Sequence, residues 1–395
     1  MSNSTVVTLR DLDLSQYNSI GPIEIQSELD SLLVDQVSRM SYPIATVQWP
    51  ASDSALKEVI VRLSQLQIRA FSFYDSRLPK RQVLAILRLN EATALDFRLT
   101  DISDKLLAAF PIVKCLKVMR IWNKSKKVTD LGVNEIARIA PALEHLDLIE
   151  AKVTDSFVEA IQKLEKLKTL RTYGLFSSIK GCSLRGLANC KSLIDLELVD
   201  WPLSDNQLDF ISEITTLRRL ALVGRWKADK SLSAKKLSTV LGTTSLKSLD
   251  LSNTPCTDEL LDAVTAATTL EELKIESGPI TLSGFRYLTR CQHLRHLAIN
   301  APMPQIDDSW METLRALPNL ESVELAAPQI TAKSLQNFSN LSRLRSLQLH
   351  LSGISTKDAI QVFSRNSPLT DLSLKLGSLP YLTSLKELVR NSGQI

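Results

Sequence analysis

The sequence of 395 residues is poor in the residue types from which most catalytic and metal sites are built. It has four histidines, five cysteines without a C-x-x-C pair, and 12 glycines without a glycine-rich phosphate loop. His145, His296 and His350 fall on separate copies of the repeat described below, so their side chains cannot gather around one ion. We therefore expect no metal, no cofactor and no enzymatic nucleophile with its base.

An excess of one charge and long apolar runs are also missing. Lysine and arginine number 47 against 43 acidic residues, and a net charge of +4 is too small to indicate nucleic-acid binding. No run of 18 apolar residues predicts a membrane span, and the first residues lack the pattern of a secretory signal. An odd number of cysteines predicts reduced thiols in a cytoplasmic protein.

The sequence is rich in one leucine pattern that returns at a fixed interval. Leu246-x-x-Leu249-x-Leu251 is followed 24 residues later by the same pattern from Leu270, and again 24 residues later from Leu294. The alternation predicts a strand with one buried face. The apolar residues that follow have the spacing of a short helix. A fixed period of this length indicates a repeat solenoid, because one unit alone cannot enclose its apolar residues.

Fifteen segments carry the pattern, and most of them follow one another at or slightly above this interval. They begin at Leu9, Ile44, Ile68, Ala92, Val113, Leu143, Leu167, Leu193, Leu217, Leu246, Leu270, Leu294, Leu320, Leu344 and Leu369. We expect an N-terminal cap over residues 1–43, repeats over 44–375 and a C-terminal cap over 376–395. Helical spacing within 25–37 and 379–389 predicts one helix in each cap.

Hydroxyl residues mark the expected helix starts. Thr129, Thr154 and Thr257 each follow an apolar residue and precede an aspartate. A threonine here predicts an N-cap, and the aspartate after it complements the helix dipole.

The unit L-x-x-L-x-L-x-x-x-x-h-T-D-x-x-L, in which h is apolar, resembles the cysteine-containing, ribonuclease-inhibitor-like class of leucine-rich repeats. Cys190 and Cys291 match the cysteine of that class, whereas its asparagine after the strand is replaced, for example by Trp201 and Thr254. The resemblance implies an α/β solenoid, a horseshoe with a parallel sheet on its concave face and short helices on its convex face. The class includes F-box proteins and many bacterial repeat proteins, although residues 1–43 contain no F-box-like segment.

Three longer repeats run from Val113 to Leu143, from Leu167 to Leu193 and from Leu217 to Leu246. Their extra residues follow the strand and carry an aromatic residue beside lysines: Trp122 with Lys124 and Lys126, then Phe176, then Trp226, while Trp201 fills the same place in the repeat between. Inserted loops on one face of a repeat array often form its binding face, and tryptophan is enriched at interface centres. The alternative is that these aromatic residues pack in the core, Trp201 above all.

The strand positions beneath these loops are expected to face outward. They are Cys115, Lys117, Met119, His145, Asp147, Thr169, Arg171, Tyr173, Asp195, Glu197, Arg219 and Val223. Their mixed charge suits a protein or peptide better than a polyanion. We therefore predict a partner-binding site of Trp122, Lys124, Lys126, Arg171, Tyr173, Phe176, Asp195, Glu197, Trp201, Arg219 and Trp226.

The function indicated is non-enzymatic recognition of a protein partner through the concave face and its aromatic edge. A nucleic acid, a membrane and a small molecule are disfavoured. One alternative is an adaptor of the ubiquitin-ligase type or a bacterial effector delivered into a host cytosol. A third is a GTPase-regulating protein, for which Arg171 and Arg219 are nominal candidates.

The repeat frames make a prediction about burial. Leu249, Leu251, Leu273, Ile275, Leu297 and Ile299 should share one core, with Asp250, Lys274 and Ala298 on the open side. A slip of one residue would invert these two sets. All five thiols should be free, with Cys190 and Cys291 buried at equivalent points of their repeats.

Overall fold

The structure is a computed structural model in which the described residues form a regular series of strands and helices. They are 23–24, 44–47, 69–73, 80–88, 91–122, 126–173, 184–201, 208–224, 233–299, 307–326, 329–331, 333–334, 341–351 and 369–376, with a few single positions between them. The helices predicted within 25–37 and 379–389 lie outside the described residues. The chain divides into two compact units, 1–193 and 194–395. Each is described by itself.

The first unit repeats a strand followed by a helix. Its elements are β1 (Ile23–Glu24), β2 (Ile44–Val47), β3 (Ala70–Ser72), α3 (Lys80–Arg88), β4 (Ala94–Arg98), α4 (Asp104–Ala108), β5 (Val118–Trp122), α5 (Asp130–Ile139), β6 (His145–Ile149), α6 (Phe157–Ile161), β7 (Thr169–Tyr173) and the 3-10 helix η2 (Leu184–Asn189). The strands lie side by side in chain order. β1 pairs antiparallel with β2, and each later pair from β2 to β7 is parallel.

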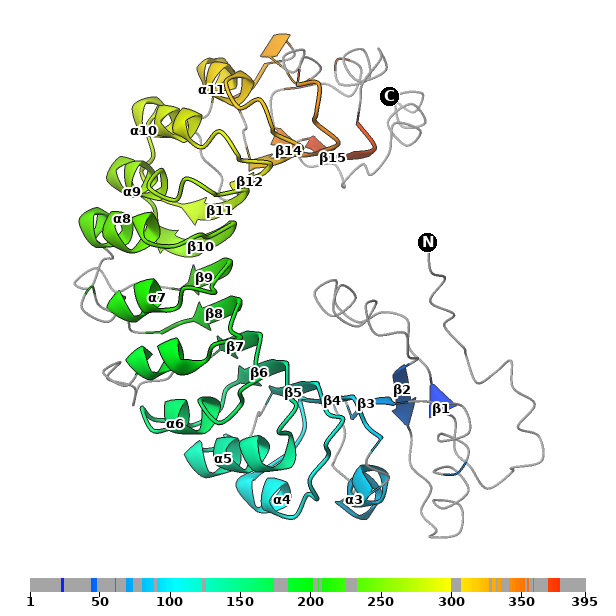
Figure 1. The fold of residues 1–395 in the computed structure, drawn as a ribbon. Helices are drawn as coiled ribbons and strands as arrows, with labels where there is room; N and C mark the ends of the chain where they lie inside the picture. Colours follow the sequence, from blue (N-terminus) through cyan, green and yellow to red (C-terminus); the bar gives the residue numbers. More distant parts are fainter. Residues whose placement is uncertain are drawn as a thin grey trace. The chain divides into compact units, whose positions relative to one another are not determined.

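The second unit continues the same alternation. Its elements are β8 (Asp195–Val199), α7 (Asp209–Glu213), β9 (Arg219–Val223), α8 (Ala234–Gly242), β10 (Ser248–Pro255), α9 (Asp258–Val264), β11 (Glu272–Ser277), α10 (Leu282–Arg286), η4 (Tyr287–Arg290), β12 (His296–Ile299), η5 (Asp308–Trp310), α11 (Met311–Arg315), β13 (Ser322–Ala326), β14 (Ser346–Leu351) and β15 (Asp371–Leu376). Its strands are all parallel. In each unit the helices lie along one side of the strands (Figure 1), and we call the opposite side the helix-free face.

The strands bury alternate residues, as the repeat pattern predicts. Leu249, Leu273 and Leu297 stand at one level of adjacent strands. All six leucines and isoleucines named for this test are buried, and Asp250, Lys274 and Ala298 are only half-buried on the helix-free face. The register predicted for these repeats is confirmed.

The frame predicted from Val113 is wrong by three residues. β5 pairs Met119 with Leu146 and Ile121 with Leu148, so this repeat begins at Leu116 and follows the preceding one after 24 residues. Its interval to Leu143 is therefore shorter than the one counted from Val113, although it still exceeds the regular interval. Met119 is fully buried, which contradicts its predicted outward position.

Other positions move with this correction. Cys115 and Lys117 are exposed, as expected, but they lie in the turn before β5 and not on the strand. The outward residues of β5 are Val118, Arg120 and Trp122. The frame from Ile44 is also shifted, because β2 pairs Ala45 with the buried Phe71 and so begins two residues earlier.

Adjacent helices are joined by a contact that we call the Thr–Asp clamp. The backbone N–H and the Oγ1 hydroxyl of Thr129 donate to the two carboxylate oxygens of Asp104, at 2.9 and 2.6 Å. The same clamp joins Thr154 to Asp130, Thr281 to Asp258 and Thr331 to Asp308. Thr129 and Thr257 also cap their own helices, as predicted, and Thr281 does the same. The N-cap predicted at Thr154 is wrong, because α6 begins at Phe157 after Ser156. The aspartate of one repeat therefore holds the helix start of the next.

The cysteine predictions hold for the described residues. Cys115, Cys190, Cys256 and Cys291 are free thiols, and all but Cys115 are buried. Cys190 and Cys291 each precede a buried leucine, Leu193 or Leu294, by three residues, at equivalent points of their repeats. Cys182 lies outside the described residues.

Candidate functional site

A row of charges of alternating sign crosses the helix-free face of the first unit. Asp96 on β4 pairs in register with Arg120 on β5, Arg120 with Asp147 on β6, and Asp147 with Arg171 on β7. We call these four residues the charged row. Opposite charges on adjacent strands attract one another, so the order of signs favours this register.

The charged row is held together by its own contacts. The Arg120 Nε atom lies 2.8 Å from the Asp147 carboxylate, and the Arg98 guanidinium donates to both carboxylate oxygens of Asp96. Arg120 and Arg171 are 6% and 5% exposed. Burial, opposed by the charge of Asp147, lowers the pKa of the Arg120 guanidinium from its ordinary value. A guanidinium nevertheless stays protonated in proteins, so Arg120 and Asp147 form a mostly buried ion pair within the row.

A second row lies at the carboxyl ends of the same strands. Arg98, Trp122, Ile149 and Tyr173 pair in register across β4 to β7, and all four are half-buried. We call them the edge row. Its aromatic residues, Trp122 and Tyr173, were predicted from the sequence. Arg98 and Ile149 were missed, although they hold the equivalent position of their strands once the frame of β5 is corrected.

Trp122 has a polar group without a partner. Its indole Nε1 atom is buried and makes no hydrogen bond in the described part of the chain. Its backbone carbonyl accepts from the N–H of Leu99 at 3.0 Å, which fixes the end of β5. Lys126, four residues further on, is exposed and has a positive φ of 51°.

Three predicted site residues lie together at the start of the second unit. Asp195 on β8 pairs in register with Arg219 on β9, with 3.9 Å between a carboxylate oxygen and Nε. Glu197, on the same face of β8, pairs with Ala221 and is buried.

Trp201 is 5% exposed and belongs to the core of the second unit. It occupies the position after the strand at which the repeat class often has asparagine, and that position faces inward. In the equivalent place, Thr254 is also buried, and its hydroxyl donates to the Leu222 carbonyl at 3.1 Å. The interpretation of Trp201 as an exposed anchor is therefore corrected.

The remaining site residues, Lys124, Phe176 and Trp226, lie outside the described residues. Among the residues that the structure does describe, no group of three or more histidine, cysteine, aspartate or glutamate side chains could hold a metal ion. The described helices are also too short or too polar to cross a membrane. His145, His296 and His350 stand on separate strands of the helix-free face.

The regular return of a strand and a helix, with parallel strands and leucines at fixed inward positions, defines an α/β leucine-rich repeat solenoid. No protein-family model matches the chain, and no curated protein sequence matches it.

Solved structures with a similar fold are leucine-rich repeat proteins. An internalin of Listeria monocytogenes is 15% identical with a TM-score of 0.45, over 82% of this chain and 93% of that one. The structure of the yeast Rad7–Elc1 complex is 17% identical with a TM-score of 0.49, over 87% of this chain and 92% of that one. The structure of TLR13 with a single-stranded RNA is 16% identical with a TM-score of 0.47, over 80% of this chain and 54% of that one.

Proposed function

We propose that this leucine-rich repeat protein is a non-catalytic binding protein whose first unit holds a protein partner against the edge row. Trp122 is the central anchor, with Ile149 on the next strand, Tyr173 one strand further and Lys126 at the border. Lys124 and Phe176 belong to the chain segments that follow β5 and β7, so they join the proposed site. The observation that carries the proposal is the indole N–H of Trp122, which is buried without an acceptor among the described residues.

A buried donor without a partner costs free energy, so it needs a compensating role. Indole rings at interfaces combine an apolar surface with one hydrogen bond, and tryptophan is enriched among residues that dominate binding energy. Because Nε1 itself is buried, the half-buried ring would have to turn outward on binding, and a carbonyl oxygen of the partner would then accept from Nε1 while the partner covers the ring. The apolar and aromatic neighbours, Ile149 and Tyr173, extend that surface along the strand ends.

The charges beneath the edge row favour a protein over a nucleic acid. Asp96 and Asp147 alternate with Arg120 and Arg171, so phosphates would meet carboxylates as well as guanidinium groups. Binding to a phosphate backbone instead favours clustered, uncompensated cations.

The thiols support the assignments of the repeat class and of a cytoplasmic location. Burial raises the pKa values of both Cys190 and Cys291 to about 11, so neither thiol is reactive. Cysteines that only fill the core at one point of the repeat fit the ribonuclease-inhibitor-like class, and free thiols fit a cytoplasmic protein. An adaptor role within that compartment remains the main alternative to a simple binding protein.

The test is a pull-down that identifies the partner, followed by binding measurements on the Trp122→Ala variant. We expect this change to weaken binding by about 2 kcal/mol or more, which is about 30-fold. The matched control is Tyr287→Ala, because Tyr287 is a half-buried aromatic residue on the helix side. Equal affinity of wild-type protein and the Trp122→Ala variant would contradict the proposal.

A further inference from the structure

The two helix-free faces differ in charge. In the first unit, the outward residues of β4 to β7 include three arginines, Arg98, Arg120 and Arg171, against the two aspartates of the charged row. In the second unit, the described outward side chains of β8 to β14 include five carboxylates against one arginine and one lysine. These are Asp195, Glu197, Asp250, Glu272 and Glu324 against Arg219 and Lys274. The second face is therefore acidic.

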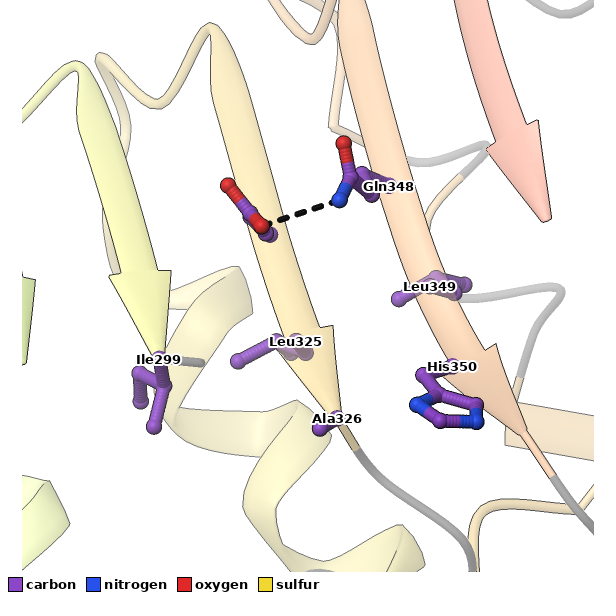
Figure 2. Close-up of a pocket in the computed structure, with 7 residues that line it drawn as sticks. Ile299, Leu325, Ala326, Gln348, Leu349 and His350 are labelled. Atoms are coloured by element: carbon purple, nitrogen blue, oxygen red, sulfur yellow. Dashed lines mark hydrogen bonds between the residues drawn. The ribbon is translucent and has the colours of Figure 1, made fainter. Parts of the chain in front are cut away.

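A small open pocket lies on this acidic face. It is lined by Ile299 on β12, by Glu324, Leu325 and Ala326 on β13, and by Gln348, Leu349 and His350 on β14. Figure 2 shows Gln348 at one end, with its hydrogen bond across to β13, and His350 further along the same strand. Ala326 stands in register with His350, and its small side chain leaves room beside the imidazole.

Glu324 is a carboxylate with no cation beside it in the described part of the chain. Its only contact within the described residues is a hydrogen bond of 2.9 Å that the Gln348 amide donates to Oε1. Its register neighbour on the other side is Ala298, which has no polar side chain. The carboxylates of Asp195 and Asp250 on this face differ, since Asp195 lies near Arg219 and Asp250 near Lys274.

The hydrogen bond leaves a set of acceptors around the pocket. Because the Gln348 nitrogen donates to Glu324, the Gln348 carbonyl oxygen and the second carboxylate oxygen of Glu324 are left as acceptors. The His350 imidazole adds a polar group to the same lining. The leucine and alanine residues between them provide an apolar lining.

We propose that this pocket binds an arginine side chain of a protein partner. A guanidinium has five donors and no acceptor, so it complements the Glu324 carboxylate and the Gln348 carbonyl oxygen at this site. Its methylene chain would lie along Ala326 and the leucines, as arginine stems commonly do on apolar surface. The site lies wholly in the second unit, and it is independent of the function proposed for the edge row.

The experiment titrates the full-length protein with N-acetyl-arginine amide and follows the side-chain NMR signals of His350. The His350→Gln variant assigns those signals. We expect saturable shifts with the arginine amide, and a loss of affinity of about fivefold or more in Glu324→Gln, the size of one partly exposed charge pair. The matched control is Glu272→Gln, a half-buried glutamate on β11 of the same face, which should leave the affinity unchanged.

Two further arms make the outcome decisive. N-acetyl-citrulline amide has nearly the same shape as the arginine compound without its charge, so it should not bind. Ala326→Leu fills the pocket and should abolish the shifts while thermal unfolding shows that the protein remains folded. The proposal is overturned if no saturable shift occurs, if citrulline binds as well as arginine, or if Glu324→Gln binds like the wild type.

Discussion

The helix side and the helix-free face of this protein use carboxylates in different ways. On the helix side, each aspartate of a Thr–Asp clamp accepts from a backbone N–H and a hydroxyl of the next repeat, as Asp258 does from Thr281. On the helix-free face of the first unit, Asp96 and Asp147 instead bond to arginine side chains. Asp96 also accepts from the backbone N–H of Arg98, but that contact lies within one strand, whereas each clamp joins the backbone of one repeat to the carboxylate of the repeat before it.

This difference indicates which contacts the stacking of repeats requires and which it does not require. A clamp fixes where the next helix begins, because its donors belong to that helix start. A buried ion pair between side chains does not determine where a helix begins. Apolar residues of similar volume often give equal or greater stability. The clamps therefore account for repeat stacking, whereas the charged row requires another explanation, for which binding next to it is the proposed one.

The largest effect is expected from breaking the charged row on one side only. Arg120→Ala removes the guanidinium that lies against Asp147 in a mostly buried place, and we expect a loss of about 3 kcal/mol in the free energy of unfolding. Urea unfolding measures this loss. The double variant Arg120→Met, Asp147→Leu should recover most of the stability. If it is as unstable as Arg120→Ala alone, the row is a structural requirement and the comparison above is wrong.

The next effect concerns a glycine that makes space for a clamp. A Cβ atom at Gly284 would lie 2.0 Å from Oδ1 of Asp258, so Gly284→Ala must displace the carboxylate. We expect a loss of about 2 kcal/mol from this overpacking, measured by urea unfolding. The control is Gly242→Ala, because a Cβ there would meet only Ala266 Cβ at 3.9 Å.

A double-mutant cycle completes this test. Asp258→Ala alone should cost about 1 to 2 kcal/mol through its lost hydrogen bonds. In that background, Gly284→Ala should cost much less than it does in the wild type, because the carboxylate is gone. Strictly additive losses would show that the glycine does not serve the clamp.

The sequence predicted the repeats well because their signal is redundant. Each frame combines buried leucines with an interval, so the inward positions of β10 to β12 followed directly. The error at Val113 arose because Val113-x-x-Leu116-x-Val118 and Leu116-x-x-Met119-x-Ile121 both satisfy the pattern. The unusually short interval between Ala92 and Val113 was the available signal, since the regular interval from Ala92 selects Leu116.

The site was harder to predict because it depends on contacts between repeats. The Thr-Asp dipeptide indicated a cap within one helix, but its contact with the preceding repeat cannot be seen in a single unit. The alternation of Asp96, Arg120, Asp147 and Arg171 was hidden by the shifted frame of β5. For Trp201, the sequence left core and surface open, and only the inward direction of that position decides between them.

A smaller effect is expected at acid pH, where the clamp of Asp308 loses its charge. Burial alone would raise the pKa of Asp308, but hydrogen bonds from Thr331 and Ser334 hold that pKa below its ordinary value. A carboxyl group with a depressed pKa stabilises the fold fully above its unfolded-state pKa, and this contribution is lost as the pH falls through the folded-state value. That window lies below about pH 4.

We therefore expect the free energy of unfolding of Asp308→Asn to be about 1 kcal/mol below that of the wild type at pH 7. At pH 2 the two proteins should be almost equally stable. Urea unfolding at the two pH values measures the difference. Glu312→Gln is the control, because Glu312 is exposed on the same helix side. A stability difference that stays constant between the two pH values would show that the clamp does not depend on the carboxylate charge.

The smallest effect on stability is expected in the edge row, which differs in this from the Thr–Asp clamps and the charged row. Trp122→Phe keeps an aromatic ring but removes the Nε1–H donor, which makes no hydrogen bond within the described residues. Since the fold loses no hydrogen bond and no longer buries an unpaired donor, we expect the free energy of unfolding to change by less than about 0.5 kcal/mol. Binding to the partner should nevertheless weaken by about 1 kcal/mol, the usual contribution of one neutral hydrogen bond. Thermal unfolding and a binding titration on the same sample measure both quantities. A variant that unfolds at a clearly lower temperature but binds normally would place Trp122 among the residues that support the fold, together with Trp201.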